Sequence, residues 1–180
     1  MNQPNTFSLQ LLQNIQDLIG SPPRIRVGGD TLDVAQYCHN CPQTLNNTFV
    51  PGNTEAFSVT FNNNLFAVLD ENVPSEQEYI FGLNLGQNDI QHPFAEFTAA
   101  ETYMNLSRFK AYKLGNEPDL YYPYKGKSGS DWGVVAYANQ TASFLLQFTA
   151  SLSKTQAKDF PGYMYASTTD MMIPFLLLLW

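Results

Sequence analysis

The chain has 180 residues, of which 44% are hydrophobic, 14% aromatic and 14% charged, a composition typical of a globular domain with a sizeable core. Nine basic residues against sixteen acidic ones give a formal net charge of −7. This balance argues against a nucleic-acid or anionic-membrane partner, because both require basic patches.

Apolar residues at helical spacing predict a helix near the amino terminus, over residues 7–19. The spacing leaves one apolar stripe, so we expect Leu11, Ile15 and Leu18 to pack inward against strand residues such as Val27 and Leu83. A strand follows at 24–27, whereas residues 34–75 are rich in Asn, Pro and Thr. Within that stretch only residues 57–61 alternate as a strand does.

The second part of the chain alternates between apolar strands and longer helical patterns. Strands are predicted at 79–85, 109–114 and 163–166, and helices at 93–104 and 131–151. This alternation favours an α/β fold with a parallel sheet and helical crossovers. The last ten residues, 171–180, are an apolar block too short to span a bilayer, which needs about 20 residues. We expect 1–170 to be the folded unit, and 171–180 to be a tail from a truncated or misread gene product.

Cys38 and Cys41 lie three residues apart in a segment rich in Pro and Asn. A redox pair, half of a zinc site, and loop cysteines that are free or locally bridged are all open readings. The loop-like surroundings favour the last of these. We expect no metal and no cofactor.

Three sequons, at Asn46, Asn105 and Asn139, favour a secretory route. Residues 1–7 are polar, so no signal peptide opens the chain. We expect an extracellular, secreted parent protein whose true amino terminus is missing here.

The most informative segment is 115–121, with the sequence GNEPDLY, directly after the strand at 109–114. Pro118 disfavours helical geometry at Glu117. A carboxylate therefore follows the carboxyl end of a strand, which is where α/β folds place their chemistry.

Two further motifs precede this segment: RIRVGGDTLD at 24–33 and IFGLNLG at 80–86. In this order the three motifs resemble glycoside hydrolase family 79, the fungal β-glucuronidases and heparanase-like enzymes. The resemblance runs from about residue 4 to about residue 159 and covers the first half of the catalytic barrel. It implies a partial, incomplete (β/α)8 TIM barrel, with about strands two to five present.

The resemblance also implies roles for individual residues. Glu117 is expected to be the acid/base of a retaining glycosidase, and Asn116 to bind the 2-hydroxyl of the sugar. The loop with Gly29, Asp30 and Thr31 is expected to contact the glycone. The family usually has Asn at the position of Asp30, which puts a preference for glucuronides in doubt.

Other residues near the motifs have two open readings each. Arg26 either supports the barrel interior or binds sugar. Tyr121, Tyr122 and Tyr124 either form a rim on which a sugar stacks or are packing residues.

The nucleophile of the family lies on the seventh barrel strand, beyond this chain. We therefore expect a fragment of a retaining β-glucuronidase-type hydrolase whose carbohydrate partner is a glucuronide, and which is inactive by itself. The alternatives are a non-catalytic carbohydrate-binding remnant and an inert truncated product.

Overall fold

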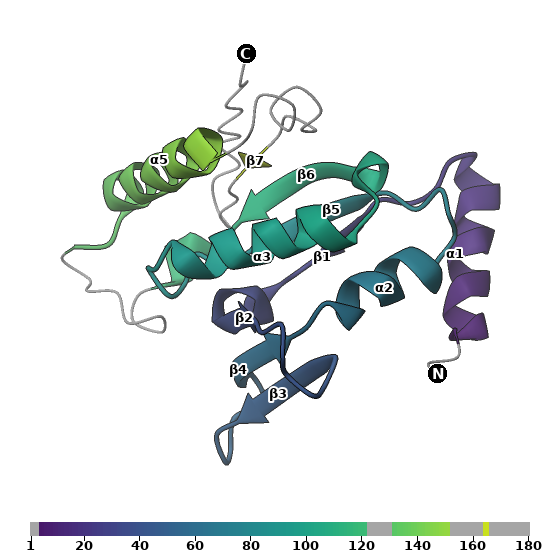
Figure 1. Ribbon diagram of the computed structural model, residues 1–180, viewed down its shortest axis with the longest axis horizontal. Coiled ribbons are helices and arrows are strands. Elements are labelled where there is room, and N and C mark those ends of the chain that lie inside the picture. Colours follow the sequence, from purple (N-terminus) through teal and green to yellow (C-terminus); the bar gives the residue numbers. More distant parts are fainter. Residues whose placement is uncertain (1–3, 122–130, 152–163, 166–180) are drawn as a thin grey trace.

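The computed structural model describes residues 4–121, 131–151 and 164–165, and Figure 1 shows their arrangement. Four of the described strands form one parallel sheet in the order β1 (Ile25–Val27), β5 (Tyr79–Leu83), β6 (Phe109–Leu114) and β7 (Met164–Tyr165). Spatial order follows chain order, so the sheet is wound in one direction over these strands. The chain is a mixed α/β protein, as the alternation of strands and helices predicts.

Helical crossovers connect the strands of this sheet. Helix α3 (Gln91–Tyr103) joins β5 to β6, and α5 (Val134–Ser151) lies between β6 and β7. Between the described elements lie the 3₁₀ turns η1 (Asp30–Val34), η2 (Leu106–Arg108) and η3 (Pro118–Leu120). The terminal block 171–180 lies outside the described residues.

The core lies between the sheet and helices α3 and α5 (Figure 1). Tyr79, Phe81 and Leu83 alternate along β5 toward this side and are at most 2% exposed. The ring of Phe97 on α3 lies 5.0 Å from that of Tyr112 on β6 and 5.4 Å from that of Phe148 on α5, measured between centroids. Aromatic packing therefore fixes both helices on one face of the sheet.

The segment that the sequence left unassigned forms a second sheet, in the order β2 (Ala35–Tyr37), β4 (Ala56–Phe61) and β3 (Leu45–Phe49). Strand β4 contains the predicted strand, and it pairs with β2 in parallel and with β3 as an antiparallel hairpin. Helix α2 (Asn64–Glu71) follows. The ring of Phe66 on α2 lies 6.0 Å from Phe61 and 5.7 Å from Phe81, which joins the second sheet to the core.

The two cysteines form a local disulfide, Cys38–Cys41, directly after β2. Of the readings open at the level of sequence, the structure shows the locally bridged pair. Both thiols are used in this bond, so neither is offered to a metal.

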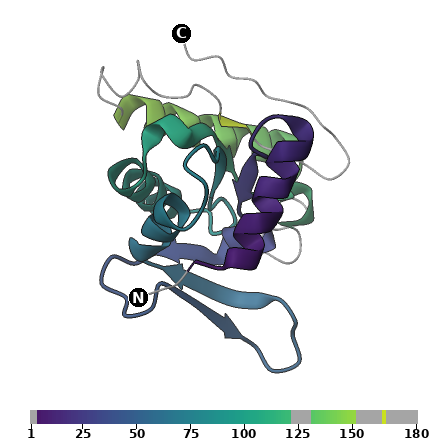
Figure 2. The same ribbon diagram turned by 90° about the vertical axis from the view of Figure 1, so that its right-hand side faces the viewer.

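The packing predicted for the first helix is wrong. Helix α1 (Thr6–Ile19) forms as expected and ends at Gly20 in the left-handed region. However, Leu11, Ile15 and Leu18 are 46%, 43% and 85% exposed, and no residue of α1 is buried. The helix lies at one end of the molecule, apart from α3 and α5 (Figures 1 and 2). Helical spacing establishes that an apolar stripe exists, but it does not specify which element covers that stripe.

Candidate active site

The two motifs singled out in the sequence meet at one edge of the parallel sheet. Strand β1 ends at Val27 and is followed by Gly28 and Gly29, both with positive φ. Strand β6 ends at Leu114 and is followed by Gly115, whose N–H donates to the carbonyl of Leu83 on β5 at 2.8 Å. Since β1 and β6 both run parallel to β5, their carboxyl ends lie on the same side. This is the placement that the sequence predicts.

Gly115 brings the segment 115–121 close to the sheet. It has φ +74°, and a Cβ here would lie 2.6 Å from the hydroxyl oxygen of Tyr121 and 2.9 Å from Cβ of Leu85. Only glycine combines this backbone geometry with such a close approach. The turn after β6 therefore holds Asn116 tightly against its neighbours.

Asn116 is the centre of a polar cluster. Its Oδ1 accepts hydrogen bonds from Nζ of Lys113 at 2.8 Å and from Nη1 of Arg26 at 3.1 Å. Its Nδ2 donates to Oδ1 of Asp30 at 2.9 Å. Two cations on the oxygen and a carboxylate on the nitrogen fix the orientation of the amide. Arg26 thus supports Asn116, and one N–H of the amide is left for a ligand.

The two cations reach Asn116 because of strand alternation. Arg26 and Lys113 point away from the face that carries Val27, Tyr112 and Leu114. Lys113 is only 3% exposed. Burial lowers the pKa of its ammonium group, and the neighbouring charge of Arg26 lowers it further.

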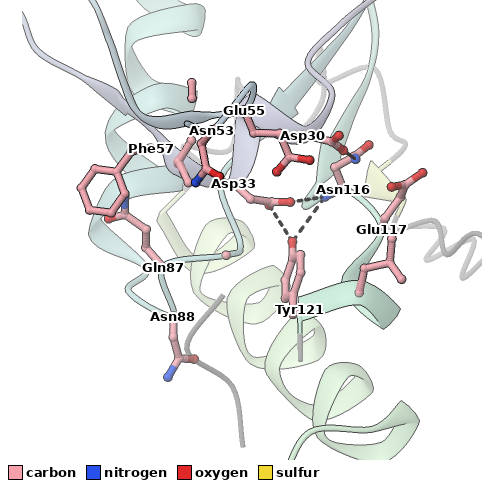
Figure 3. A pocket seen from close by; sticks show the side chains of 14 residues that line it. Asp30, Asp33, Asn53, Glu55, Phe57, Gln87, Asn88, Asn116, Glu117 and Tyr121 are labelled. Carbon is pink, nitrogen blue, oxygen red and sulfur yellow. Dashed lines mark hydrogen bonds between the residues drawn. The ribbon is translucent and has the colours of Figure 1, made fainter. Parts of the chain in front are cut away.

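Asp33 is a buried member of the site that sequence reasoning missed. It is 2% exposed, and its Oδ2 accepts the backbone N–H of Asn116 at 3.2 Å. Its Oδ1 accepts the hydroxyl hydrogen of Tyr121 at 2.6 Å (Figure 3). Asp33 thereby joins the loop after β1 to the loop after β6. Its place in the 24–33 motif was the only signal, since sequence does not reveal burial.

Tyr121 is a buried residue that packs against the site and holds it through its hydroxyl group. Its side chain is 1% exposed and its ring is stacked on that of Trp132, with centroids 5.6 Å apart. Burial raises the pKa of its phenol well above the usual value, and the charge of Asp33 raises it further. Of the two readings of Tyr121, packing is therefore the one that the structure shows. Tyr122 and Tyr124 lie outside the described residues.

Glu117 adopts a left-handed backbone conformation, with φ 46° and ψ 55°. A residue other than glycine is uncommon in this region. The 3₁₀ turn after it is anchored by Trp132, whose Nε1 donates to the carbonyl of Pro118 at 2.6 Å. The side chain of Glu117 is partly exposed and borders a cleft.

This cleft has a volume of about 960 Å³ and is lined by fourteen residues, ten of which are labelled in Figure 3. Asp30, Asn116 and Glu117 line it together. Thr31 lines a neighbouring pocket of about 400 Å³, which shares Asp30, Glu55 and Ala56 with the cleft. Gly29 lines neither of the two, and its contribution is the backbone turn that leads to Asp30. The structure thus brings three of the five sequence-predicted residues to one cleft.

Asn84 lies directly after β5, and hydrogen bonds link it to Ala35 and to Glu96 on α3. Asn84 Nδ2 donates to the carbonyl of Ala35 at 2.6 Å, and the N–H of Asn84 donates to Oε2 of Glu96 at 2.8 Å. Glu96 is fully buried, and its Oε1 has no hydrogen-bond partner. Burial raises the pKa of Glu96 well above its usual value, the Asn84 hydrogen bond opposes this, and the charge of Asp33 adds to it.

This carboxyl predicts a pH dependence of stability. A folded-state pKa above the unfolded-state pKa means that the native protein binds the proton more tightly. The contribution of Glu96 is then complete below the unfolded-state pKa and is lost as the pH rises toward the folded-state value. Glu96→Gln, which mimics the neutral form, is expected to be more stable than the wild type at pH 8 but not at pH 4. Urea unfolding at both pH values measures this.

The matched control is Glu76→Gln, because Glu76 is exposed in the connection before β5. It should leave the pH profile unchanged. A Glu96→Gln variant that is less stable than the wild type at pH 8 would show that Glu96 is held ionised.

Gly86 provides a second test of how the site is supported. A Cβ at Gly86 would lie 2.6 Å from both Cβ and the backbone oxygen of Asp33. Gly86→Ala is therefore expected to lower the free energy of unfolding by about 1–3 kcal/mol, the usual cost of overpacking. Gly133→Ala is the control, since a Cβ there meets nothing within 4 Å. Equal urea midpoints for the two variants would contradict the close approach.

Comparisons with known proteins bear on this site. No protein-family model matches the chain. It is 34% identical over 130 residues to a β-glucuronidase of Aspergillus niger, covering 67% of this chain and 23% of that protein. It is 32% identical over 125 residues to a β-glucuronidase of Neurospora crassa, covering 67% of this chain and 22% of that protein. The chain thus spans about a quarter of the length of these curated relatives.

A solved structure gives the same indication. The chain is similar to a 4-O-α-L-rhamnosyl-β-D-glucuronidase from Fusarium oxysporum 12S, whose crystal structure is a complex with Rha-GlcA. The TM-score is 0.68 and the sequence identity 25%, over 83% of this chain and 31% of that one. In sequence and in fold, the chain therefore resembles glucuronidase-like glycoside hydrolases.

Within residues 4–121, 131–151 and 164–165, no helix combines the length and the apolar character needed to cross a membrane.

Proposed function

We propose that the chain is the amino-terminal half of the (β/α)8 catalytic barrel of a retaining glycoside hydrolase of family 79. The parent enzyme would cleave O-glycosyl bonds of glucuronides outside the cell. The order of β1, β5, β6 and β7 supports a barrel, because a closed barrel adds each strand beside the preceding one. Consecutive parallel strands joined by helices α3 and α5 match this pattern.

In this proposal Glu117 is the acid/base. It protonates the oxygen of the leaving group in the first step and removes a proton from water in the second. The nucleophilic carboxylate comes from a part of the parent enzyme outside this chain. Retaining enzymes place the two carboxyl groups about 5–5.5 Å apart, so the nucleophile would lie across the cleft from Glu117.

Asn116 would bind the 2-hydroxyl of the sugar through the N–H that Asp30 leaves unused. Its orientation is set before a substrate binds, since Lys113, Arg26 and Asp30 already hold the amide. Preorganised donors of this kind stabilise the charge that develops in the transition state. Gly29, Asp30 and Thr31 would contact the glycone from the loop after β1.

One observation carries the proposal. The hydrogen bond between Asn116 and Asp30 joins two motifs 86 residues apart at the same edge of the sheet, beside Glu117. A chance similarity in sequence would not place the two motifs in contact. Both motifs border one cleft of a size suited to a glycoside.

The test is a chimera in which this chain replaces the matching segment of the Aspergillus niger β-glucuronidase. Hydrolysis of an aryl β-glucuronide by the folded chimera is expected. A chimera that folds, as judged by near-ultraviolet circular dichroism, yet shows no turnover would contradict the proposal.

A second function has a specific observation in its favour. Two of the other carboxylates that line the cleft, Asp30 and Asp33, are engaged with Asn116 and Tyr121. The isolated chain thus keeps the polar groups proposed to bind sugar, while two of its cleft carboxylates are already used in hydrogen bonds within the protein. Carbohydrate binding without hydrolysis is therefore the function we propose for this polypeptide when it is not joined to the rest of the barrel.

A further inference from the structure

The charge of the cleft is one-sided. Among the fourteen described residues that line it, four are acidic and none is Lys, Arg or His; the acidic ones are Asp30, Asp33, Glu55 and Glu117. In the described part of the chain, Arg26 and Lys113 are directed to Oδ1 of Asn116 and do not line the cleft. An anionic group placed among these residues would meet like charges, which weakens binding. The cleft is therefore suited to uncharged groups.

An aromatic ring lies on the far side of the cleft from Glu117. Phe57, Val59 and Phe61 occupy alternate positions along β4, and the pairing of β4 with β3 is irregular at Phe57. Val59 and Phe61 are each 5% exposed, because the core covers them, whereas Phe57 lies beyond the core and is 69% exposed. One end of β4 thus contributes to the core, and Phe57 at its other end lines the cleft.

Polar side chains accompany Phe57. Asn53 on the hairpin, and Gln87 and Asn88 after β5, line the same part of the cleft. Figure 3 shows Phe57, Gln87 and Asn88 on the side opposite Asn116 and Glu117. Oε1 of Gln87 accepts a hydrogen bond from Gln36 at 2.9 Å, which leaves the nitrogen of this amide as the donor. An aromatic face with amides beside it is a combination that binds the apolar face and the hydroxyls of a sugar.

We propose that the part of the cleft between Asn116 and Phe57 is a subsite for an uncharged sugar unit of the substrate, stacked on Phe57. The carboxylate of a uronate unit is then bound by residues other than these fourteen. This inference rests on the proposed function and adds to it a second, neutral unit recognised by the β3–β4 hairpin. At about 960 Å³ the cleft lies in the range of pockets that hold ligands larger than one sugar.

The experiment uses the full 180-residue chain, with its folded state checked by circular dichroism. Affinities are measured by ligand-observed NMR for methyl β-glucoside and methyl β-glucuronide, which differ only in the charge at C6. The glucoside is expected to bind more tightly. Phe57→Ala should weaken glucoside binding about 3–10-fold, the usual effect of an aromatic contact. Phe7→Ala is the matched control, because Phe7 on α1 is 71% exposed and lines neither cavity.

A second variant tests the charge. Glu55→Gln should raise the affinity for the glucuronide about 2–5-fold, as expected for removing one partly solvated like charge, and added salt should reduce this gain. Glu71→Gln, at the exposed end of α2, should change nothing. The subsite is refuted if neither glycoside binds, if the glucuronide binds as tightly as the glucoside, or if Phe57→Ala and Phe7→Ala behave alike.

These outcomes are separable from the test of the proposed function. A chimera that hydrolyses the aryl glucuronide, together with a chain that binds no glucoside, would refute the subsite alone. An inactive folded chimera, together with a chain that binds glucoside through Phe57, would refute the catalytic assignment and retain the subsite.

Discussion

Glu117→Gln is expected to lower kcat of the chimera about 10²–10⁴-fold on a glycoside with a poor leaving group, the usual contribution of a general acid/base. The amide cannot donate a proton to the leaving oxygen as a carboxylic acid does. Glutamine has the same length as glutamate and suits the left-handed backbone at position 117 no worse. The loss should therefore reflect chemistry rather than folding.

The leaving group provides an internal check on this result. An activated aryl glycoside needs little protonation, so its glycosylation step should lose less than that of an alkyl glycoside. Glu76→Gln, remote from the cleft, is the control and should retain full activity. Equal losses on both substrates, or a kcat unchanged by Glu117→Gln, would remove Glu117 from the acid/base role.

The purified 180-residue chain alone is expected to show no turnover of an aryl β-glucuronide, even where it binds glycosides. Acid/base and nucleophile act as a unit, and one member alone contributes little. Asp30 and Asp33 are held by hydrogen bonds from Asn116 and Tyr121, which leaves them poorly placed to attack an anomeric carbon. Turnover is measured by release of the aryl group over several hours.

The control for that assay is the Glu117→Gln form of the same short chain, purified in parallel. Any hydrolysis common to both forms is contamination. Hydrolysis by the wild-type chain that disappears in Glu117→Gln would show that the short chain contains a complete catalytic unit, and the assignment of the nucleophile to another segment would be wrong.

Most of the parallel sheet can be predicted from the sequence, because its strands are short apolar runs separated by helical patterns. Strands β5 and β6 and helix α3 lie where the pattern predicts them. The second sheet cannot be predicted in the same way, since β2 pairs with β4 in a register that places Ala35 opposite Val59. Such pairing depends on residues distant in the sequence, and a polar stretch with few apolar positions does not specify it.

The candidate site also contains residues that the sequence identifies and residues that it does not. The motifs identify Asn116 and Glu117, and the parallel arrangement of strands predicts that Asp30 lies nearby. The role of Asp33 depends on its burial, and the role of Tyr121 depends on its stacking against the ring of Trp132. Neither feature can be predicted from the residues adjacent in the sequence. The packing predicted for α1 is wrong for a related reason, because an apolar stripe does not specify which element, if any, covers it.

The backbone at Glu117 has one more consequence. Strained conformations of this kind cost about 1–3 kcal/mol, and glycine would relieve that cost at position 117. In the acid/base role proposed for Glu117, stability and activity make opposite demands at this position, as they do in many enzymes. A laboratory selection of the chimera for thermal resistance alone would then favour Gly at position 117, whereas a selection that also requires hydrolysis of a glycoside would retain Glu117.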